Sequence, residues 1–274
     1  MYDFLRLSKN ISDVVLDSIS SLVGTKAADE IMGIGADGTA TKKIDLVAEN
    51  AVIGVLKDFG EDMTILSEEC GIISIGDEPK FKIILDPLDG TYNAIHGLPI
   101  YSISIAFVDP FSSVANFGYV RCFAPDTEIY AIKDGGVYYN GTKVHASSKE
   151  SLKESSIGLY GSGKGISKIV PLYKHSHRIR CLGSAAYEMA LVGCGMLDAF
   201  IDARDILRIT DIAASELIVK EGGGCVSTTS GKKLDLEFLP TARTSILAAG
   251  NRKLHENILK IMSDQSGGNN DGTY

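Results

Sequence analysis

The sequence is poor in several features that mark common protein classes. Its 274 residues contain no tryptophan, only seven prolines, and five cysteines that are scattered along the chain without a CxxC pair. An odd number of dispersed cysteines favours reduced, buried thiols over a framework of disulfides. This pattern is typical of a cytoplasmic protein.

Long apolar runs and an excess of positive charge are also missing. No apolar run approaches the roughly 20 residues that a helix needs to cross a bilayer. Residues 1–13 carry charges throughout, unlike the apolar segment of a signal peptide. The formal net charge of -8 disfavours sequence-independent binding to nucleic acid. We therefore expect a cytoplasmic protein with no membrane or nucleic-acid partner, which binds anions only at a local site.

What the sequence does have is ordinary globular composition with much glycine. Hydrophobic residues make up 45% and charged residues 23%, and there are 29 glycines. The glycines indicate tight turns and close backbone approaches. The length allows one large domain or two tightly joined lobes, with a sizeable core in either case.

The first half of the chain predicts two helices followed by a sheet. Apolar residues recur at spacings of three and four over residues 3–23 and 46–59, which predicts two amphipathic helices, each followed by a glycine. The glycine-rich, polar segment 33–43 is predicted to be a mobile loop. Apolar runs separated by turn residues over 64–146 predict an antiparallel sheet backed by the two helices.

Beyond about residue 150 the pattern changes to strands that alternate with helices, which is typical of a layered α/β unit. Strands are expected near 155–160, 178–182, 197–202, 224–227 and 245–249, and helices near 166–175, 184–195, 210–221 and 252–263. We predict an N-terminal α+β lobe over residues 1–150 and a C-terminal α/β lobe over residues 151–263. The polar tail, residues 264–274, is predicted to be disordered.

Two carboxylates stand where an apolar strand is expected to end. In KIILDPLDGTYNAIHG (82–97), the apolar run leads directly into Asp86 and Asp89. A carboxylate at the end of a buried strand costs free energy unless its charge is compensated. Gly90 permits close approach of another group, and Thr91 can begin a helix whose free N–H groups attract anions. A metal cation would neutralise the aspartates and bridge them to a phosphate.

Four other acids can join this pair. Glu68 and Glu69 follow the neighbouring predicted strand, Asp211 stands at a predicted helix start, and Asp45 opens the second predicted helix. Taken alone, each aspartate is explained as a helix cap and the glutamates as a solvated edge. Their occurrence together with Asp86 favours a shared metal site.

Three segments together resemble the signatures of a known superfamily. They are LSEEC (66–70), LDPLDGTYNA (85–94) and ITDIAASELIVKEGGG (209–224). In order and spacing they resemble the inositol monophosphatase superfamily, and the match extends over roughly residues 30–250. The longer forms DPLDGTYNAIHGLPIYSISIAF and LDAFIDARDILRITDIAA are most similar to its archaeal branch. In that branch one enzyme serves as both fructose-1,6-bisphosphatase and inositol-1-monophosphatase.

The resemblance implies a fold, a reaction and a set of cofactors. The fold would be the layered sugar-phosphatase sandwich, α+β followed by α/β, with alternating α-β-α-β-α layers and the active site between the lobes. The reaction would be hydrolysis of fructose 1,6-bisphosphate to fructose 6-phosphate, and of inositol 1-phosphate, within gluconeogenesis and carbohydrate metabolism. The protein would be a homodimer with two to three Mg²⁺ ions per subunit, which Mn²⁺ can replace.

The same resemblance assigns the metal ligands. Glu68 and Asp86 would hold the first ion, together with the backbone carbonyl of Leu88. Asp86, Asp89 and Asp211 would hold the second ion. Ligands that are all oxygen suit Mg²⁺ or Mn²⁺ and do not select zinc.

The resemblance also assigns the catalytic groups. Thr91 would orient a metal-activated water, with Asp45 or Glu68 behind it as the proton acceptor. The water would attack the phosphorus directly, so that no nucleophilic side chain is needed. The phosphate would rest beside Asp89 on the N–H groups of Gly90 and Thr91. A third, weaker metal site would lie near Asp45 and the loop GADGT, and inhibition by Li⁺ would be weak.

Substrate selectivity would come from the second lobe. Arg180 and the backbone of Ala185 lie in HRIRCLGSAA, where the family places substrate contacts. Arg204 stands where inositol-selective animal relatives carry a glutamate. Because the planar arginine fork donates two hydrogen bonds at once, Arg204 favours a bisphosphate substrate. The alternative is that Arg204 only pairs with a nearby acid, Asp202 or Asp205.

Other functions remain open from the sequence. The same metal core would suit a phosphatase acting on 3′-phosphoadenosine 5′-phosphate or NADP. GLYGSGKG (158–165) is one residue away from the phosphate-loop pattern of nucleotide binders, but glycine stands at position 165 in place of the hydroxyl residue that would hold Mg²⁺. A non-catalytic protein that binds a phosphate ligand is a further alternative, against which the intact acidic residues argue.

Overall fold

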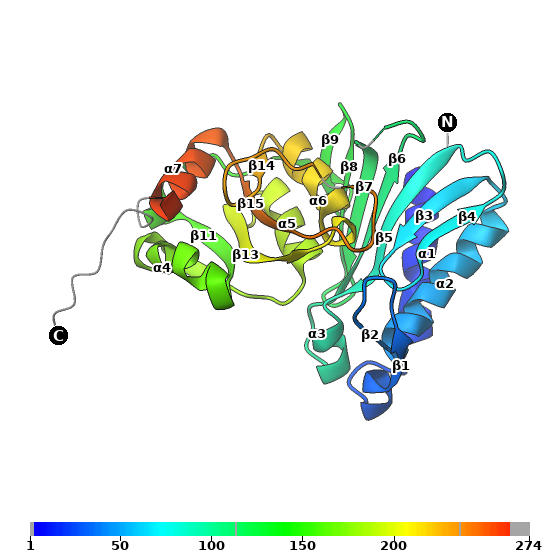
Figure 1. Ribbon diagram of the computed structural model, residues 1–274. Helices are drawn as coiled ribbons and strands as arrows, with labels where there is room; N and C mark the ends of the chain where they lie inside the picture. Colours follow the sequence, from blue (N-terminus) through cyan, green and yellow to red (C-terminus); the bar gives the residue numbers. More distant parts are fainter. Residues whose placement is uncertain (1–2, 113, 236, 264–274) are drawn as a thin grey trace.

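The computed structural model describes residues 3–112, 114–235 and 237–263, and it is built from alternating layers of helices and sheets (Figure 1). The predicted tail, residues 264–274, lies outside the described residues. The α-helices are α1 (Phe4–Ile19), α2 (Lys43–Phe59), α3 (Thr91–His96), α4 (Ile166–His175), α5 (Ala185–Gly193), α6 (Ile209–Glu221) and α7 (Arg252–Ser263).

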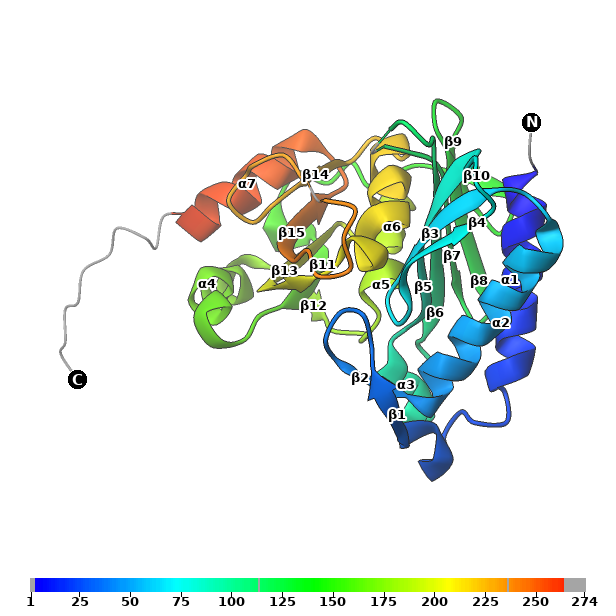
Figure 2. The same cartoon turned by 45° about the vertical axis from the view of Figure 1, so that its right-hand side comes forward.

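The layers follow the predicted order α-β-α-β-α. Helices α1 and α2 cover the outer face of a first sheet, and α5 and α6 fill the space between this sheet and a second one (Figures 1 and 2). Helices α4 and α7 lie against the other face of the second sheet. The layered-sandwich prediction is therefore confirmed.

The first sheet has eight strands in the order β10-β9-β8-β7-β6-β5-β3-β4. They are β3 (Met63–Ser67), β4 (Gly71–Ile75), β5 (Phe81–Asp89), β6 (Ser102–Val108), β7 (Ala115–Cys122), β8 (Thr127–Ile132), β9 (Gly136–Tyr139) and β10 (Thr142–Val144). The prediction of an antiparallel sheet is wrong for one pair, because β3 and β5 run parallel. After the β3–β4 hairpin, the chain returns to the other side of β3, which makes β5 run in the direction of β3.

The glycine-rich segment near residue 35 is more ordered than predicted. It forms a small antiparallel hairpin of β1 (Ile31–Ile34) and β2 (Ala40–Lys42), whose pairing shifts in register between Ile31 and Gly33. Ile31, Ile34 and Thr41 are β-branched, and such residues favour extended pairing despite the neighbouring glycines. The hairpin carries the loop 35–39 toward the second sheet (Figure 2).

Strand β5 continues through the DPLD motif instead of ending at Leu85 as predicted. Asp86 pairs with Ser104 and Asp89 with Ser102, so three steps along β5 match two steps along β6. This mismatch is a β-bulge, in which one extra residue bends the strand and redirects its side chains. A proline is tolerated at a bulge because the ladder hydrogen bond is already missing there. The bulge turns both aspartates toward the site described below.

The second sheet has five strands in the order β12-β11-β13-β15-β14. They are β11 (Ser156–Tyr160), β12 (Arg178–Arg180), β13 (Ala199–Leu207), β14 (Cys225–Ser227) and β15 (Thr244–Ala249). The strands and helices predicted beyond residue 150 are confirmed. Strand β13 is irregular between Asp202 and Leu207, where Asp205 has a positive φ of 57°. This irregular segment leads into α6 and carries Arg204.

One apolar core joins the two sheets. It buries residues that precede residue 150, such as Ile84 and Val120, together with residues that follow it, such as Phe200 and Ile212. Both faces of α6 are buried because a sheet lies on each side of it, whereas α1 buries a single stripe. The lobe boundary near residue 150 stays a prediction. No helix within the described ranges is long and apolar enough to cross a bilayer.

Candidate functional site

Three acids from distant parts of the chain meet between the two sheets. Glu68 follows β3, Asp86 lies at the bulge of β5, and Asp211 lies in the first turn of α6. Each offers a carboxylate oxygen, and these oxygens lie within 4.8 Å of one another. Asp86 and Asp211 are only 1% and 4% exposed. Buried like charges at this separation are unfavourable unless a cation compensates them.

The environment of Asp86 fits a metal ion. Burial, reinforced by the neighbouring Glu68 carboxylate, raises the pKa of Asp86 well above its usual value. Its Oδ1 accepts a hydrogen bond from Leu88 N at 3.0 Å. Its Oδ2 is buried and has no hydrogen-bond partner in the part of the chain that the structure describes. An orphaned carboxylate oxygen among other carboxylates is a suitable donor for a hard cation such as Mg²⁺ or Mn²⁺.

Asp89 is hydrogen-bonded to residues at the start of α5. Its Oδ2 accepts hydrogen bonds from Ser184 Oγ at 2.6 Å and from Ala186 N at 2.8 Å. Burial, with the nearby Asp211 carboxylate, raises the pKa of Asp89 to about 6. The aspartate from the first sheet is thus oriented by the start of α5.

Thr91 is hydrogen-bonded to Asp45, one of the two acids that the resemblance offers as its partner. Thr91 Oγ1 donates to Asp45 Oδ1 at 2.8 Å and lies 3.1 Å from the carbonyl oxygen of Leu88. Asp45 Oδ2 also accepts from Lys42 N at 3.3 Å, so Asp45 caps α2 as well. Burial raises the pKa of Asp45 to about 7. A carboxylate with this pKa is suited to exchange protons near neutral pH.

Gly90 brings two backbone segments into contact beside this pair. Its φ is +92°, and a Cβ atom there would lie 3.1 Å from the carbonyl oxygens of both Gly183 and Ile100. Such spacing is too tight for a side chain, and the positive φ is also unfavourable for other residues. The predicted glycine requirement therefore has a physical cause in this fold.

Arg208 lies within the acid cluster, and the sequence reasoning missed it. Its Nη2 lies 2.9 Å from Asp211 Oδ1, and its Nη1 lies 3.0 Å from Asp37 Oδ2 and also donates to Glu68. Burial opposes the charge on Arg208, but the carboxylates of Asp211 and Glu68 outweigh it and raise the pKa of Arg208. Only its position three residues before Asp211 could have indicated this pairing.

The loop of the β1–β2 hairpin reaches the second sheet through Asp37. Besides Arg208, Asp37 Oδ2 contacts Arg243 Nη2 at 3.3 Å. Asp37 Oδ1 accepts from Thr39 N at 2.8 Å and from Thr39 Oγ1 at 2.7 Å, which holds the turn. Asp37 belongs to the loop GADGT, which the resemblance related only to a third metal site. Its pairing with Arg208 and Arg243 was not predicted, because no local pattern relates positions so far apart in the sequence.

A cavity of about 490 Å³ opens beside these groups. Its lining includes three acids, three arginines and the start of α5: Asp37, Asp89, Asp211, Arg204, Arg208, Arg243, Gly183 and Ala185. A cavity of this volume suits a small-molecule ligand. The mixture of acids and arginines is suited to a phosphate held beside a metal ion.

A comparison with protein families decides the affiliation of the chain. The model described as the inositol monophosphatase family matches residues 6–266. The chain belongs to the inositol monophosphatase family.

Two relatives of known sequence and one solved structure agree with this affiliation. The fructose-1,6-bisphosphatase/inositol-1-monophosphatase of Methanothermobacter thermautotrophicus is 42% identical over 96% of this chain and 97% of the relative. The bifunctional NADP phosphatase/NAD kinase of Methanococcus maripaludis is 35% identical over 96% of this chain but only 50% of the relative. A crystal structure named inositol monophosphatase-fructose 1,6 bisphosphatase superposes with a TM-score of 0.85 at 27% identity, over 96% of this chain and all of the other.

Arg204, in this family member, is paired with an acid and also faces the cavity. Its Nη2 lies 2.5 Å from Asp202 Oδ2, and its Nε lies 3.0 Å from Asp202 Oδ1. Its guanidinium carbon lies 4.8 Å from the centre of the Tyr160 ring. Arg204 is thus paired with Asp202, and the pairing leaves Arg204 in the cavity wall, so its predicted role in binding a substrate stays a prediction.

Arg180 and Ala185 have different surroundings. Ala185 begins α5 and lines the cavity. Arg180 lies exposed on β12, at the edge of the second sheet, and its Nη1 donates to the carbonyl of Ile179 at 3.0 Å. The structure therefore brings Ala185 and Arg204 to the cavity, while Arg180 stands outside its lining.

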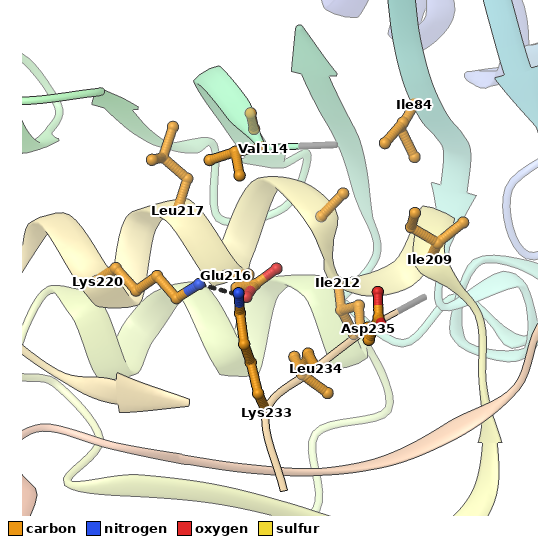
Figure 3. A pocket seen from close by; sticks show the side chains of 12 residues that line it. Ile84, Val114, Ile209, Ile212, Glu216, Leu217, Lys220, Lys233, Leu234 and Asp235 are labelled. Atoms are coloured by element: carbon orange, nitrogen blue, oxygen red, sulfur yellow. Dashed lines mark hydrogen bonds and ion pairs between the residues drawn. The ribbon is translucent and has the colours of Figure 1, made fainter. Parts of the chain in front are cut away.

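A second, smaller cavity of about 120 Å³ lies on the flank of α6 (Figure 3). Its wall is apolar around Ile84, Ile212 and Leu217, with the ion pair of Lys220 and Glu216 at one side. None of the clustered acids lines it. Of the two cavities, only the larger is lined by a member of the acid cluster, Asp211.

Proposed function

We propose that this protein is a Mg²⁺-dependent phosphomonoesterase that hydrolyses fructose 1,6-bisphosphate to fructose 6-phosphate and also hydrolyses inositol 1-phosphate. The observation that carries the proposal is the cluster of Glu68, Asp86 and Asp211, which meets the arginine-lined cavity through Asp211. The names of the archaeal relatives support the choice of substrates.

The acidic residues would hold two ions, and a third more weakly. Glu68, Asp86 and the carbonyl of Leu88 would hold the first ion, and Asp86, Asp89 and Asp211 would hold the second. When bound, such ions polarise the phosphoryl oxygens and lower the pKa of a bound water. The buried, orphaned Oδ2 of Asp86 supports this assignment.

Thr91 and Asp45 would direct the attacking water. Because Thr91 Oγ1 donates its proton to Asp45, its oxygen lone pairs are available to accept a hydrogen bond from a water. Asp45 would take up the proton that the water loses. The water oxygen forms the new bond to phosphorus as the bond to the ester oxygen breaks, and the leaving oxygen takes up a proton from solvent water. Glu68 is a weaker candidate for the proton acceptor, since Arg208 donates to it.

The substrate would bind with its reacting phosphate beside Asp89 and the N–H groups of Gly90 and Thr91. A second phosphate would meet Arg204, whose bonds to Asp202 use Nε and Nη2 and so direct Nη1 toward other acceptors. Ala185 would contact the substrate through its backbone. Arg180, which lies outside the cavity lining, would contact the substrate only at the outer edge of the cavity, beyond the segment that contains Gly183.

A phosphatase acting on NADP or on 3′-phosphoadenosine 5′-phosphate is the second candidate. The relative from Methanococcus maripaludis that carries NADP phosphatase in its name favours it, although this chain spans half of that relative. A phosphate-loop function is disfavoured by the packing of residue 165. A Cβ atom at Gly165 would lie 2.0 Å from the carbonyl oxygen of Ala203, so the required hydroxyl residue has no room there.

The direct test is phosphate release by the purified protein with Mg²⁺. Fructose 1,6-bisphosphate, inositol 1-phosphate, NADP and 3′-phosphoadenosine 5′-phosphate are compared at equal concentration, with and without excess EDTA. We expect the highest kcat/KM for fructose 1,6-bisphosphate, measurable hydrolysis of inositol 1-phosphate, and none with EDTA. Faster hydrolysis of a nucleotide would select the second candidate. Absence of release from all four would leave a non-catalytic binding protein.

We further propose a cytoplasmic homodimer that acts in gluconeogenesis. Light scattering should then give twice the chain mass of 29.3 kDa. Inhibition by Li⁺ is expected to be weak, and inhibition at submillimolar Li⁺ would contradict this expectation.

A further inference from the structure

A buried glutamate outside the cavity lining is hydrogen-bonded to residues 182–183, the segment that contributes Gly183 to the cavity wall. Glu188 lies in α5 and is 0% exposed. Its Oε1 accepts hydrogen bonds from Tyr160 Oη, from Leu182 N at 2.9 Å and from Gly183 N at 3.3 Å. One carboxylate oxygen thus gathers a strand residue and two successive backbone N–H groups.

The residues held by Glu188 lead directly to Asp89. Gly183 N also donates to Tyr160 Oη at 2.6 Å, which closes the network around the loop. The next residue, Ser184, donates to Asp89 Oδ2 at 2.6 Å, and Ala186 N donates to the same oxygen at 2.8 Å. Asp89 is one of the ligands proposed for the second ion, so its orientation depends on the position of this loop.

The same network leads in the other direction to the substrate wall. The ring of Tyr160, whose hydroxyl donates to Glu188, lies 4.8 Å from the guanidinium carbon of Arg204. Tyr160 and Arg204 both line the cavity. Glu188 itself does not line the cavity, but it is hydrogen-bonded to two residues that do, Tyr160 and Gly183.

The surroundings of Glu188 indicate more than a structural role. Its Oε2 is buried without a hydrogen-bond partner among the residues that the structure describes. An unpartnered buried carboxylate oxygen destabilises the fold relative to an apolar side chain of similar volume. Gly158 leaves room for this oxygen, since a Cβ atom there would lie 3.0 Å from Oε2 and 2.8 Å from the Phe200 ring. An unfavourable group with space built around it is typical of a functional constraint.

We propose that Glu188 is a positioning residue that, through Tyr160 and residues 182–186, orients Asp89 for the second metal ion and holds Tyr160 beneath Arg204. The part concerning substrate rests on the proposed function, whereas the part concerning the metal does not. Loss of a residue that orients a metal ligand in this way weakens metal affinity by about 10- to 100-fold.

The test compares Mn²⁺ binding by calorimetry in the full-length protein. In Glu188→Met, which removes the acceptor while keeping the volume, we expect the second Mn²⁺ to bind at least about tenfold more weakly. In Glu188→Gln, which retains one acceptor oxygen, we expect affinity within about twofold of wild type. Asp198→Leu is the matched control: Asp198 is also buried in the second lobe, but it bonds Ser156 N and Lys149. Its loss should leave Mn²⁺ binding unchanged.

Tyr160→Phe tests whether the residues act as one network. It removes the hydroxyl and keeps the ring that faces Arg204. We expect weaker Mn²⁺ binding than in wild type, and we expect Tyr160→Phe/Glu188→Met to bind Mn²⁺ no more weakly than Glu188→Met alone. Effects that add would mean independent residues and would overturn the proposal. If Glu188→Met fails to fold, Tyr160→Phe and Glu188→Gln decide: unchanged Mn²⁺ affinity in Tyr160→Phe overturns the proposal.

Activity measurements separate this inference from the proposed function. With inositol 1-phosphate, Glu188→Gln should restore the kcat that Glu188→Met loses, which a loss of stability alone would not predict at a temperature where both variants are folded. Wild-type protein that binds Mn²⁺ but hydrolyses neither sugar phosphate would overturn the proposed function. The Mn²⁺ comparison would still decide the role of Glu188.

Discussion

The two walls of the site are built in different ways. The wall from the first sheet draws Thr91 and most of its acids from residues 68–91, where neighbouring strands end side by side, and Asp45 from the start of α2. The wall from the second sheet draws on separate elements, from Tyr160 on β11 to Arg243 before β15. Most of the proposed metal ligands come from adjacent strands and are joined by Asp211 from α6, whereas groups that surround a substrate come from several elements at greater sequence distance.

The walls also differ in charge. The first wall concentrates carboxylates, and their pKa values are raised because they are buried together. The second wall contributes arginines, each of which is held by an acid: Arg204 by Asp202 and Arg208 by Asp211. Fixed, paired arginines lose little freedom when they bind a phosphate, which favours selectivity. We therefore assign the chemistry to the first wall and the choice of substrate to the second.

The largest effect is expected from Asp86→Asn. Both proposed ions depend on Asp86, and metal ions contribute several kcal/mol to the stabilisation of the transition state. We expect kcat to fall by about a thousandfold or more for every substrate. Phosphate release with saturating Mg²⁺ measures this, and Asp17→Asn, on the exposed side of α1, should retain full activity. Retained activity in Asp86→Asn would remove the first wall from the chemistry.

Thr91→Val is expected to have the next largest effect. The valine keeps the shape of threonine but cannot orient a water or donate to Asp45. We expect kcat to fall by about a hundredfold, the lower range for lost acid–base catalysis. The KM and the Mn²⁺ affinity should change little, and Thr91→Ser should restore most of kcat. A fall in Mn²⁺ affinity as large as the fall in kcat would show that Thr91 supports the metal instead of the water.

The pH dependence of stability should reveal the crowded carboxylates of the first wall. In the folded protein without metal the pKa of Asp45 is raised to about 7 and that of Asp89 to about 6, whereas unfolded aspartate has a pKa of about 4. The folded state therefore binds more protons between about pH 4 and pH 7, and the free energy of unfolding falls as the pH rises through this window.

Urea denaturation in EDTA at pH 5, 6, 7 and 8 measures this trend. Mg²⁺ should oppose it, because the cation stabilises the ionised carboxylates. Stability in EDTA that rises between pH 5 and pH 7 would contradict the account of the first wall.

Arg204→Ala should have a smaller effect than Asp86→Asn or Thr91→Val and should change substrate choice alone. A hydrogen bond to a charged group contributes about 1.5–3 kcal/mol, so we expect kcat/KM for fructose 1,6-bisphosphate to fall about tenfold or more. The value for inositol 1-phosphate should stay within about twofold, because that substrate has no second phosphate. Arg180→Ala, outside the cavity lining, should have a smaller effect on both. An equal fall for both substrates would break the division between the two walls.

The order of the layers and most of the elements could be predicted from the sequence. The periodicity of α1 and α2 and the alternation beyond residue 150 reflect which faces are buried, and these are local patterns. The parallel pairing of β3 with β5 and the bulge at Asp86 were not predictable in this way. Both depend on which strands become neighbours in space.

The candidate site was predictable to a different extent on its two walls. Asp86, Asp89 and Thr91 share one motif, and the structure places them together. Arg208 was missed, because an arginine three residues before a helix aspartate has the pattern of an ordinary ion pair. The contact of Asp37 with Arg208 was also missed, because the two residues lie far apart in the sequence. No sequence pattern indicated the role of Glu188, since its neighbours in α5 are apolar and its hydrogen-bond partners come from other segments.

The most direct test of the central claim is the number of Mn²⁺ ions that the protein binds when an acid of either wall is replaced. Calorimetric titration of wild type, Asp211→Asn and Asp86→Asn measures it, because Asp211 is the one acid that the second wall is proposed to supply to the metals. The account predicts at least two ions in wild type, one fewer in Asp211→Asn, and loss of both proposed sites in Asp86→Asn. If Asp211→Asn binds as many ions with the same affinity as wild type, the metal site is not shared between the two walls and the account is contradicted.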